Sequence, residues 1–363
     1  MKVVLVCLSD LPTLQNGMYL IYDYLRDKGD KIFTIGSQDI TSGYLASGDN
    51  YTFLVPESPR PSFNSITLLA KQIGSIVKQI IALQPDVIHF TSKHLWNVFI
   101  ILSLKLKTKA KIIHTFHDPI GHDGDEQQRG VRYYYRVMTK LVDAIVVHSK
   151  KCYVETKQIL RAKCNVVRVP LGSSKWRGYC APSQIHNKLL FFGRINNYKG
   201  VEYIPLVADE MKTRMPQVKL VVAGKAAQDF PEATLDALRR RNNVELINEF
   251  IPEAQLDSFF DESDVVIITH TSITQSGVIT DAYTHSKPVV AFRIEGIEEF
   301  IANDELCVSD FDINEYCEQL VKLLSDFDYL KSESKLAWEF GTQRFTDKVM
   351  ANMLEEVYRG LIS

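Results

Sequence analysis

The most constraining feature of this sequence is a regular alternation of short β-branched runs with segments that place apolar residues at helical spacing. The short runs predict strands at residues 3–7, 31–35, 51–55, 86–90, 111–115, 144–148 and 165–169, and then at 188–192, 218–223, 244–247, 264–269 and 288–292. Helices are predicted between them, for example at 17–28, 65–83, 201–212 and 253–261. Nearly continuous apolar strands that alternate with helices are typical of parallel sheets covered on both faces. The sequence therefore predicts a doubly wound α/β fold.

A break in this alternation divides the chain. Residues 171–188 are rich in glycine, serine and proline and show no periodicity, which is typical of a linker. Two domains also suit a length of 363 residues, because a domain has ~100–200 residues. We expect an N-terminal domain over 1–170, a C-terminal domain over 171–344, and a last helical segment over 345–363 that returns to the N-terminal domain. Two such domains face each other across a cleft, with ligands at the carboxyl ends of the strands.

Charge and hydropathy exclude several classes of protein. The formal net charge is only −2, which argues against a nucleic-acid binder, although residues 1–170 carry +8 and the remainder −10. The longest apolar run, residues 95–104, is too short to span a bilayer. The chain shows no cleavable signal pattern, and none of its six cysteines forms a C-x-x-C pair. We therefore expect a cytoplasmic protein with free thiols.

The segment 191–200, Phe-Phe-Gly-Arg-Ile-Asn-Asn-Tyr-Lys-Gly, lies between a predicted strand and a predicted helix. Gly193 ends the strand, and Arg194 and Lys199 project from the loop that follows. Two cations beside a helix N-terminus suit a diphosphate, because backbone donors and the helix dipole add to the fixed charges. A solvated loop with a capping glycine would give the same pattern.

A second polar loop, residues 269–283, follows an apolar strand and leads into a helix. Gly277 allows backbone N–H groups to approach a phosphate closely, and Asp281 can accept hydrogen bonds from ribose hydroxyls. The alternative is an N-capped helix whose aspartate complements the helix dipole. Taken alone, this segment favours the alternative.

Together the two segments resemble the family-4 retaining glycosyltransferases, or glycosyl transferases group 1, which have the architecture called GT-B. The matches are F-x-G-R-x-x-x-x-K-G, a small-residue loop with an acidic residue before alanine, and K-P-V-V-A at 287–291. The turn at 295–299 is similar to the family's G-G-x-P-E, and the resemblance covers the C-terminal half. It implies two Rossmann-like domains and a nucleotide-diphosphate sugar as donor, with no other cofactor.

By this resemblance, Gly193, Arg194 and Lys199 hold the diphosphate, and both cations stabilise the leaving group. The other donor-site residues implied are Ile251 with its neighbours' backbone at the nucleobase, Gln275, Ser276 and Gly277 near the phosphate and sugar, Asp281 at the ribose, and Glu299 organising its loop. One departure concerns a glutamate that the family usually carries near the donor sugar, eight residues before the ribose position. That position is Ile273 here, and Gln275 nearby brings polarity without charge.

The N-terminal half contains a histidine-rich loop, residues 114–126, after the predicted strand 111–115. It resembles the family's T-H-D loop, which implies that His117 reaches toward the reacting sugar and that Asp118 structures the loop. We expect His122 and Asp125 to line the acceptor pocket. The first loop of the chain is only thinly similar to the family's glycine-rich loop, and it places Asn16 and Gly17 near the acceptor or the donor phosphate.

Two features of the N-terminal half, its histidine-rich loop and its apolar run, each have a second interpretation. Three histidines within nine residues, with Asp123-Gly124-Asp125, could indicate a metal site, but their spacing gives no helical pair and we expect none. The apolar run 95–104 leads into a lysine-rich segment, which predicts either a buried helix with basic C-terminal residues or contact with an anionic membrane. We expect a buried helix for the apolar face, and we expect peripheral contact with an anionic membrane for the basic half as a whole.

The resemblance implies a metal-independent, retaining hexosyltransferase that moves a sugar from a UDP- or GDP-sugar to a hydroxyl of a glycan or lipid-linked acceptor. Cell-surface polysaccharide synthesis is the usual setting of bacterial relatives. A protein of a different functional class is the alternative, because the absence of the glutamate is also compatible with an inactive glycosyltransferase-like binding subunit. A third alternative is a GT-B nucleotide-sugar hydrolase or epimerase.

Overall fold

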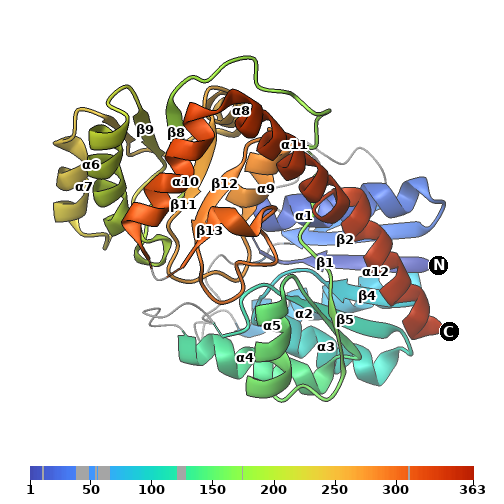
Figure 1. Ribbon diagram of the computed structural model, residues 1–363. Helices are drawn as coiled ribbons and strands as arrows, with labels where there is room; N and C mark the ends of the chain where they lie inside the picture. The colour runs from blue at the N-terminus through green and yellow to red at the C-terminus, as the bar shows by residue number, and fades with distance from the viewer. Residues whose placement is uncertain are drawn as a thin grey trace. The chain divides into compact units, whose positions relative to one another are not determined.

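The computed structural model describes residues 1–9, 12–37, 49–53, 55, 66–120, 128–173, 175–309 and 311–363. The chain forms two compact units (Figure 1). Unit 1 comprises Met1–Ser174 together with Asp347–Ser363, and unit 2 comprises Lys175–Thr346. Each unit contains its own sheet and its own apolar core.

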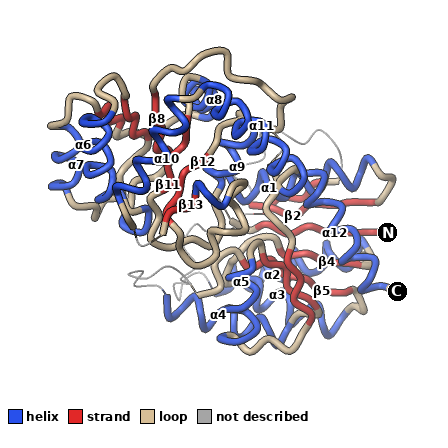
Figure 2. The backbone as a smooth tube through the Cα atoms, in the orientation of Figure 1, coloured by secondary structure: helices blue, strands red, loops and turns tan. Residues whose placement is uncertain are grey.

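Unit 1 is built on one sheet, whose strands are red in Figure 2, and all neighbouring strands in it are parallel. Its order is β3-β2-β1-β4-β5-β6-β7. The strands are β1 (Lys2–Cys7), β2 (Lys31–Ser37), β3 (Asn50–Phe53), β4 (Val87–Phe90), β5 (Lys111–Phe116), β6 (Ala144–Val147) and β7 (Asn165–Arg168). The order reverses between β1 and β4, and ligands of doubly wound sheets bind at the carboxyl ends of strands at such a switch point.

The helices of unit 1 cover this sheet with apolar faces. They are α1 (Pro12–Asp27), α2 (Ile66–Leu83), α3 (Trp96–Lys107), α4 (Gln128–Leu141), α5 (Lys150–Val154) with a π-helical turn at Glu155–Ile159, and α12 (Asp347–Ile362). The last helix, α12, packs against α1 (Figure 1). The hydroxyl of its buried Tyr358 lies 2.5 Å from Nδ1 of His89 on β4, so the C-terminal segment is part of the unit 1 core.

Unit 2 repeats the arrangement with a second all-parallel sheet of order β10-β9-β8-β11-β12-β13. The strands are β8 (Lys188–Phe192), β9 (Lys219–Ala223), β10 (Val244–Ile247), β11 (Val265–Ile268), β12 (Val289–Phe292) and β13 (Cys307–Val308). The helices are α6 (Ile204–Arg214), α7 (Glu232–Arg239), α8 (Glu253–Asp261), α9 (Gly277–Thr284), α10 (Ile313–Ser325) and α11 (Phe327–Arg344). The switch point of this sheet lies between β8 and β11, the strands that precede the two predicted donor loops.

These sheets confirm the predicted fold class of two doubly wound α/β domains. One local prediction was wrong, because α1 begins at Pro12 and not at Gly17. Proline fits the first helical turn, where its missing N–H leaves no hydrogen bond unmade, so α1 starts early and contains Asn16 and Gly17. The strand β13 was not predicted, since two residues carry no detectable alternation. Within the described ranges, no helix combines the length and the hydropathy needed to cross a membrane.

Candidate functional site

The loop after β8 is held between the ends of the two neighbouring strands. Gly193 and Gly200 both have left-handed backbone conformations, with φ values of 99° and 61°. A Cβ atom on Gly200 would overlap the carbonyl oxygen of Thr269, which directly follows β11, and the Thr269 hydroxyl donates to the carbonyl of Lys199 at 2.8 Å. On the other side, Gly224 after β9 lies so close that a Cβ atom there would overlap the Gly193 carbonyl. Glycine at these positions lets the loop pack onto the carboxyl edge of the sheet.

This packing buries the side chain of Lys199. The residue is only 7% exposed, and its ammonium lies 3.4 Å from the carbonyl oxygen of Phe192, a long hydrogen bond. A Cβ atom on Gly193 would lie 2.8 Å from that ammonium, so the glycine leaves the space that the lysine occupies. Burial lowers the pKa of Lys199 to about 8. The site therefore contains a buried cation whose charge the protein itself stabilises only weakly. An anionic ligand would stabilise this cation.

A cavity of about 780 Å³ opens beside this loop. Its lining includes three residues predicted for the donor site, Gly193, Arg194 and Ile251. Arg194 is exposed and makes no hydrogen bond or ion pair with the described part of the chain. The volume is within the usual range for a small-molecule site, roughly 300–1,000 Å³.

The same cavity includes residues that the sequence prediction missed. Gly224, Lys225 and Ala226 follow β9, and Gln228 lies slightly further along. Phe250, 75% exposed, also lines the cavity, but it is one of the neighbours of Ile251 whose backbone was predicted at the nucleobase. The available signal was the Gly-Lys pair directly after the predicted strand 218–223, which repeats the pattern of a glycine and a cation after β8. Lys225 adds a second positive charge to the cavity wall next to Arg194.

Helix α9 brings the second predicted segment to the same edge of the sheet. Ser276 is its N-cap and accepts from the Ile279 backbone N–H at 3.3 Å, so the capping alternative describes the local structure. A Cβ atom on Gly193 would lie 3.3 Å from Val278 in the first turn of α9, which places this helix against the β8 loop. Gly277 at the helix start is exposed. The N-terminus of α9 and the Lys199 loop are thus adjacent, as a phosphate site requires.

Four further predicted positions have different surroundings. Asp281 lies on α9, and burial raises its pKa to about 6. The side-chain oxygen of Gln275 is buried and has no hydrogen-bond partner among the described residues, so it suits a hydroxyl donor from a ligand. Ile273 is 2% exposed and belongs to the apolar core, so it offers no polar contact. Glu299 lies in the turn after β12, and its predicted role remains a prediction.

In unit 1, the predicted sugar-contacting histidine lies directly after β5. His117 Nε2 lies 2.9 Å from the carbonyl oxygen of Thr91, the residue that follows β4. This position is at the carboxyl ends of the strands, next to the β1/β4 switch point. Asp118 is the next residue, and its charge opposes the lowering of the His117 pKa that burial causes.

The other acceptor-site predictions are not tested by the structure. Asn16 and Gly17 lie inside α1 and not in a loop, as stated above. His122 and Asp125 lie outside the described residues. Among the residues described, no three histidine, cysteine, aspartate or glutamate side chains form a group that could hold a metal ion.

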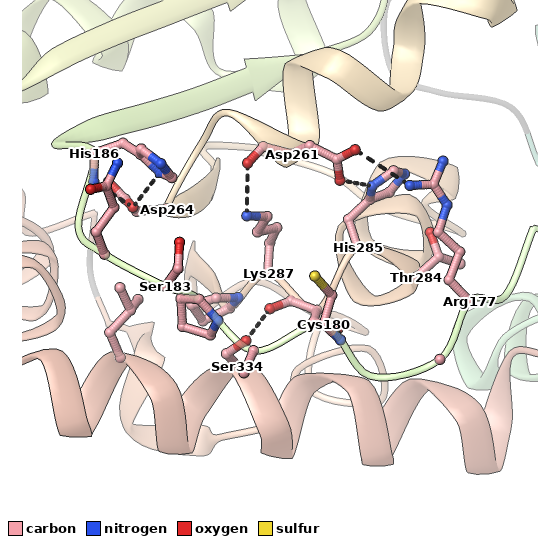
Figure 3. A pocket seen from close by; sticks show the side chains of 17 residues that line it. Arg177, Cys180, Ser183, His186, Asp261, Asp264, Thr284, His285, Lys287 and Ser334 are labelled. Atoms are coloured by element: carbon pink, nitrogen blue, oxygen red, sulfur yellow. Dashed lines mark hydrogen bonds and ion pairs between the residues drawn. The ribbon is translucent and has the colours of Figure 1, made fainter.

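A second pocket of unit 2, of about 260 Å³, is lined by residues that come just before β8, β11 and β12, so it lies at the amino ends of these strands. Figure 3 shows its side chains. Its lining includes Asp264, whose carboxylate accepts from the backbone N–H groups of His186 and Lys188 at 3.0 and 2.9 Å. His285 lies between two carboxylates of α8, 2.8 Å from Asp261 and 3.2 Å from Asp257. These groups pair with one another through hydrogen bonds and ion pairs, and they hold the segment that precedes β8 in place. We therefore interpret the pocket as a structural contact between segments.

Comparison with protein families matches each half of the chain to a glycosyltransferase model. Residues 15–172 match the model described as Glycosyltransferase Family 4, and residues 186–326 match the model described as Glycosyl transferases group 1. A relative from Streptomyces kanamyceticus, an alpha-D-kanosaminyltransferase, is 25% identical over 174 residues, which are 47% of this chain and 45% of that protein. The chain thus matches less than half of the length of this curated relative.

Solved structures extend the likeness to the whole chain at the level of fold. A glycosyltransferase from Rickettsia africae superposes with a TM-score of 0.75 at 16% identity and covers 100% of this chain and 99% of its own. The Anabaena protein HepE, solved in complex with UDP and glucose, gives a TM-score of 0.72 at 17% identity, with 98% and 99% covered. At this level of identity the likeness establishes the shared fold.

Proposed function

This chain belongs to the GT-B glycosyltransferases and resembles family 4 in both halves, and on that premise we propose that it is a retaining glycosyltransferase. The donor is a nucleotide-diphosphate sugar, a UDP- or GDP-sugar, and the acceptor is a hydroxyl of a glycan or a lipid-linked glycan. The observation that carries this proposal is the buried, weakly compensated ammonium of Lys199 at the β8/β11 switch point. An anion is the ligand that such a group stabilises most.

The protein acts on the leaving group chiefly through charge. Lys199, Arg194 and the N-terminus of α9 surround the diphosphate and stabilise the negative charge that develops when the bond to the sugar breaks. Asp281 accepts hydrogen bonds from the ribose hydroxyls. The backbone beside Ile251 faces the nucleobase from the cavity wall.

The reaction proceeds with retention by attack on the face that the diphosphate leaves. The acceptor oxygen bonds to the anomeric carbon while the bond from that carbon to the phosphate oxygen breaks. The acceptor proton passes to the leaving phosphate, so no protein carboxylate needs to act as nucleophile. This route is compatible with Ile273, an apolar residue in the place where the family usually carries a glutamate. No metal ion takes part.

The experiment that tests this function is a thermal-shift screen with UDP, GDP, ADP and TDP, with and without EDTA. A nucleotide at 100 times its Kd adds roughly 2.7 kcal/mol to the free energy of unfolding. A shift with one nucleotide that persists in EDTA and disappears in Arg194→Ala supports the donor site. No shift with any nucleotide overturns it and favours the binding-subunit alternative, while release of free sugar without an acceptor indicates a hydrolase.

Peripheral membrane contact and a role in cell-surface polysaccharide synthesis are part of the proposal. Helix α3 exposes Phe99, Leu102 and Leu106 at 48%, 45% and 88%, and its last turn carries Lys105 and Lys107. Exposed apolar side chains beside lysines suit an anionic bilayer surface. Flotation with phosphatidylglycerol vesicles tests this contact, and equal flotation with neutral phosphatidylcholine vesicles contradicts the electrostatic part.

A further inference from the structure

Four histidines lie close together near the carboxyl ends of β4, β5 and β6 in unit 1. Two of them, His89 and His114, have hydrogen-bond partners on both ring nitrogens. The other two, His117 and His148, each have a partner on one nitrogen, and their rings are 4.9 Å apart. This difference separates a structural pair from a pair with unused hydrogen-bonding capacity.

His148 directly follows β6 and is 7% exposed. Its Nδ1 lies 2.9 Å from the carbonyl oxygen of Val169. A carbonyl can only accept, so Nδ1 carries the ring proton and Nε2 is left as a bare acceptor in the neutral ring. That Nε2 atom is buried and has no hydrogen-bond partner within the described ranges. A buried acceptor without a partner costs free energy unless a ligand or water supplies a donor.

His117 has the complementary arrangement. Its Nε2 donates to the carbonyl oxygen of Thr91 at 2.9 Å, so Nδ1 is the bare nitrogen of this ring. No hydrogen bond links that Nδ1 to the part of the chain that the structure describes. Burial lowers the pKa of His148 to about 3 and also lowers the pKa of His117, which favours the neutral form of both rings. The two neighbouring rings therefore present two acceptors and no charge.

We infer that His117 and His148 form a paired acceptor site for two hydroxyl groups of one sugar ring. The inference rests on the proposed function and adds His148 as a second sugar-contacting residue beside His117. Two neutral acceptors select a ligand with two O–H donors, as a sugar diol has. They do not select an anion, because bare nitrogens repel negative charge and have no proton to donate. They also leave a metal ion short of ligands, since the described residues hold no group of three metal ligands here.

A substitution can separate the bare nitrogen from the structural hydrogen bond of the same ring. In His148→Asn, the side-chain amide keeps a donor near the position of Nδ1 for the Val169 carbonyl and removes the acceptor at the position of Nε2. The matched control is His114→Asn, because His114 is also buried and donates from Nδ1 to a backbone carbonyl, that of Thr115 at 2.8 Å. Both variants lose one ring nitrogen, but only the first loses an unoccupied acceptor.

The test is long-range ¹H–¹⁵N NMR of the histidine side chains of the full chain. In the free protein, His148 Nε2 and His117 Nδ1 are expected at the frequency of bare nitrogens. Methyl α-D-glucopyranoside, methyl α-D-mannopyranoside and methyl α-D-galactopyranoside are then titrated, with ethanol at equal hydroxyl concentration as control. At least one glycoside is expected to move both resonances toward the hydrogen-bonded range, while His89 and His114 stay unchanged. Protonation of His148 Nε2 in the free protein, or no movement with any glycoside, overturns the inference.

Kinetics with the active donor distinguish this inference from the proposed function. His148→Asn is expected to lower kcat/KM roughly 3- to 10-fold, the effect of one lost hydrogen bond to a neutral hydroxyl. The thermal shift with the free nucleotide is expected to stay as in the wild type, because the nucleotide site lies in unit 2. Wild-type kcat/KM in His148→Asn refutes the role of His148 and leaves the donor site standing. Loss of nucleotide binding by the wild-type chain itself refutes the proposed function.

Discussion

The ammonium nitrogen of Lys199 lies 3.4 Å from the carbonyl oxygen of Phe192, the last residue of β8. No carboxylate forms an ion pair with this lysine among the residues described. A buried cation with one long hydrogen bond destabilises the free protein, because burial removes water from the charge without replacing it. The same desolvation strengthens the attraction to a bound diphosphate, since charges interact more strongly where water is excluded.

Removing this cation is expected to reduce sugar transfer strongly. Lys199→Ala should lower kcat by about 10²–10³-fold, the loss seen when a donor that stabilises a developing negative charge is removed. Lys212→Ala is the control, because Lys212 is an exposed lysine on the neighbouring helix α6. Steady-state assays with the active donor measure both variants, and unchanged turnover in Lys199→Ala would remove Lys199 from the mechanism.

The lowered pKa of Lys199 predicts the alkaline limit of nucleotide-sugar binding. The diphosphate requires the protonated lysine, so affinity should fall as the pH rises through about 8, by up to about tenfold per pH unit. The stability of the free protein should change in the opposite direction. Between pH 8 and the ordinary lysine pKa of 10.5, the unfolded chain binds more protons than the folded chain, so stability rises with pH by about 3 kcal/mol in total.

Calorimetric titrations from pH 7 to pH 9.5 measure the affinity, and urea unfolding from pH 7 to pH 10.5 measures the stability. Lys199→Met should bind weakly and with no alkaline decline, because methionine does not titrate. An alkaline decline that persists in Lys199→Met would assign the titration to another group.

The raised pKa of Asp281 predicts the acidic limit. The carboxylate accepts hydrogen bonds from ribose hydroxyls better than the carboxylic acid does, so affinity should fall as the pH drops through about 6. A nucleotide sugar is the correct ligand, because its two phosphates are both esterified and keep their charge in this range. Asp281→Asn should bind more weakly at pH 8 and show no decline between pH 7 and pH 5. The control Asp328→Asn changes an exposed acid in the first turn of α11 and should behave as the wild type.

Gly200 should tolerate no side chain. Its backbone has a φ of 61°, and a Cβ atom would overlap the carbonyl oxygen of Thr269. Gly200→Ala is expected to lower the free energy of unfolding by about 2–4 kcal/mol, from the left-handed conformation and the forced displacement together. Gly178→Ala in the same unit meets nothing within 4 Å and should stay within about 0.5 kcal/mol of the wild type.

Urea unfolding followed by tryptophan fluorescence measures both variants, since two of the three tryptophans, Trp176 and Trp338, belong to unit 2. Equal stability of the two variants would contradict the close approach of the β8 loop to the end of β11.

Local sequence signals were sufficient for most of the fold. Strands such as β8 and β10 were predicted at their observed bounds, because short apolar runs between turn residues are the direct signature of buried parallel strands. The start of α1 was predicted too late, because Pro12 is typical of a loop in the sequence but lies in the first turn of the helix. The two-residue strand β13 exists only because β12 offers it backbone partners.

The residues of the candidate site also include some that local sequence patterns predict and others that only the fold brings to the site. Gly193, Arg194 and Lys199 were found because a strand end followed by a glycine and two cations is a local pattern. The Gly-Lys pair at 224 and 225 was missed, since only the order of the sheet places the end of β9 beside that of β8. The sequence also gives no sign that Lys199 is buried, because its burial arises from the close approach of the loop to Thr269.

Periodicity and local motifs are enough to predict the α/β class, the parallel sheets and the residue types that a diphosphate site needs. The bare ring nitrogens of His117 and His148 could not be predicted in this way, because they depend on the carbonyls of Thr91 and Val169, which other segments of the chain supply. In each ring, one nitrogen is already hydrogen-bonded to a residue that is distant in sequence. What a side chain has left for a ligand is therefore fixed by the fold.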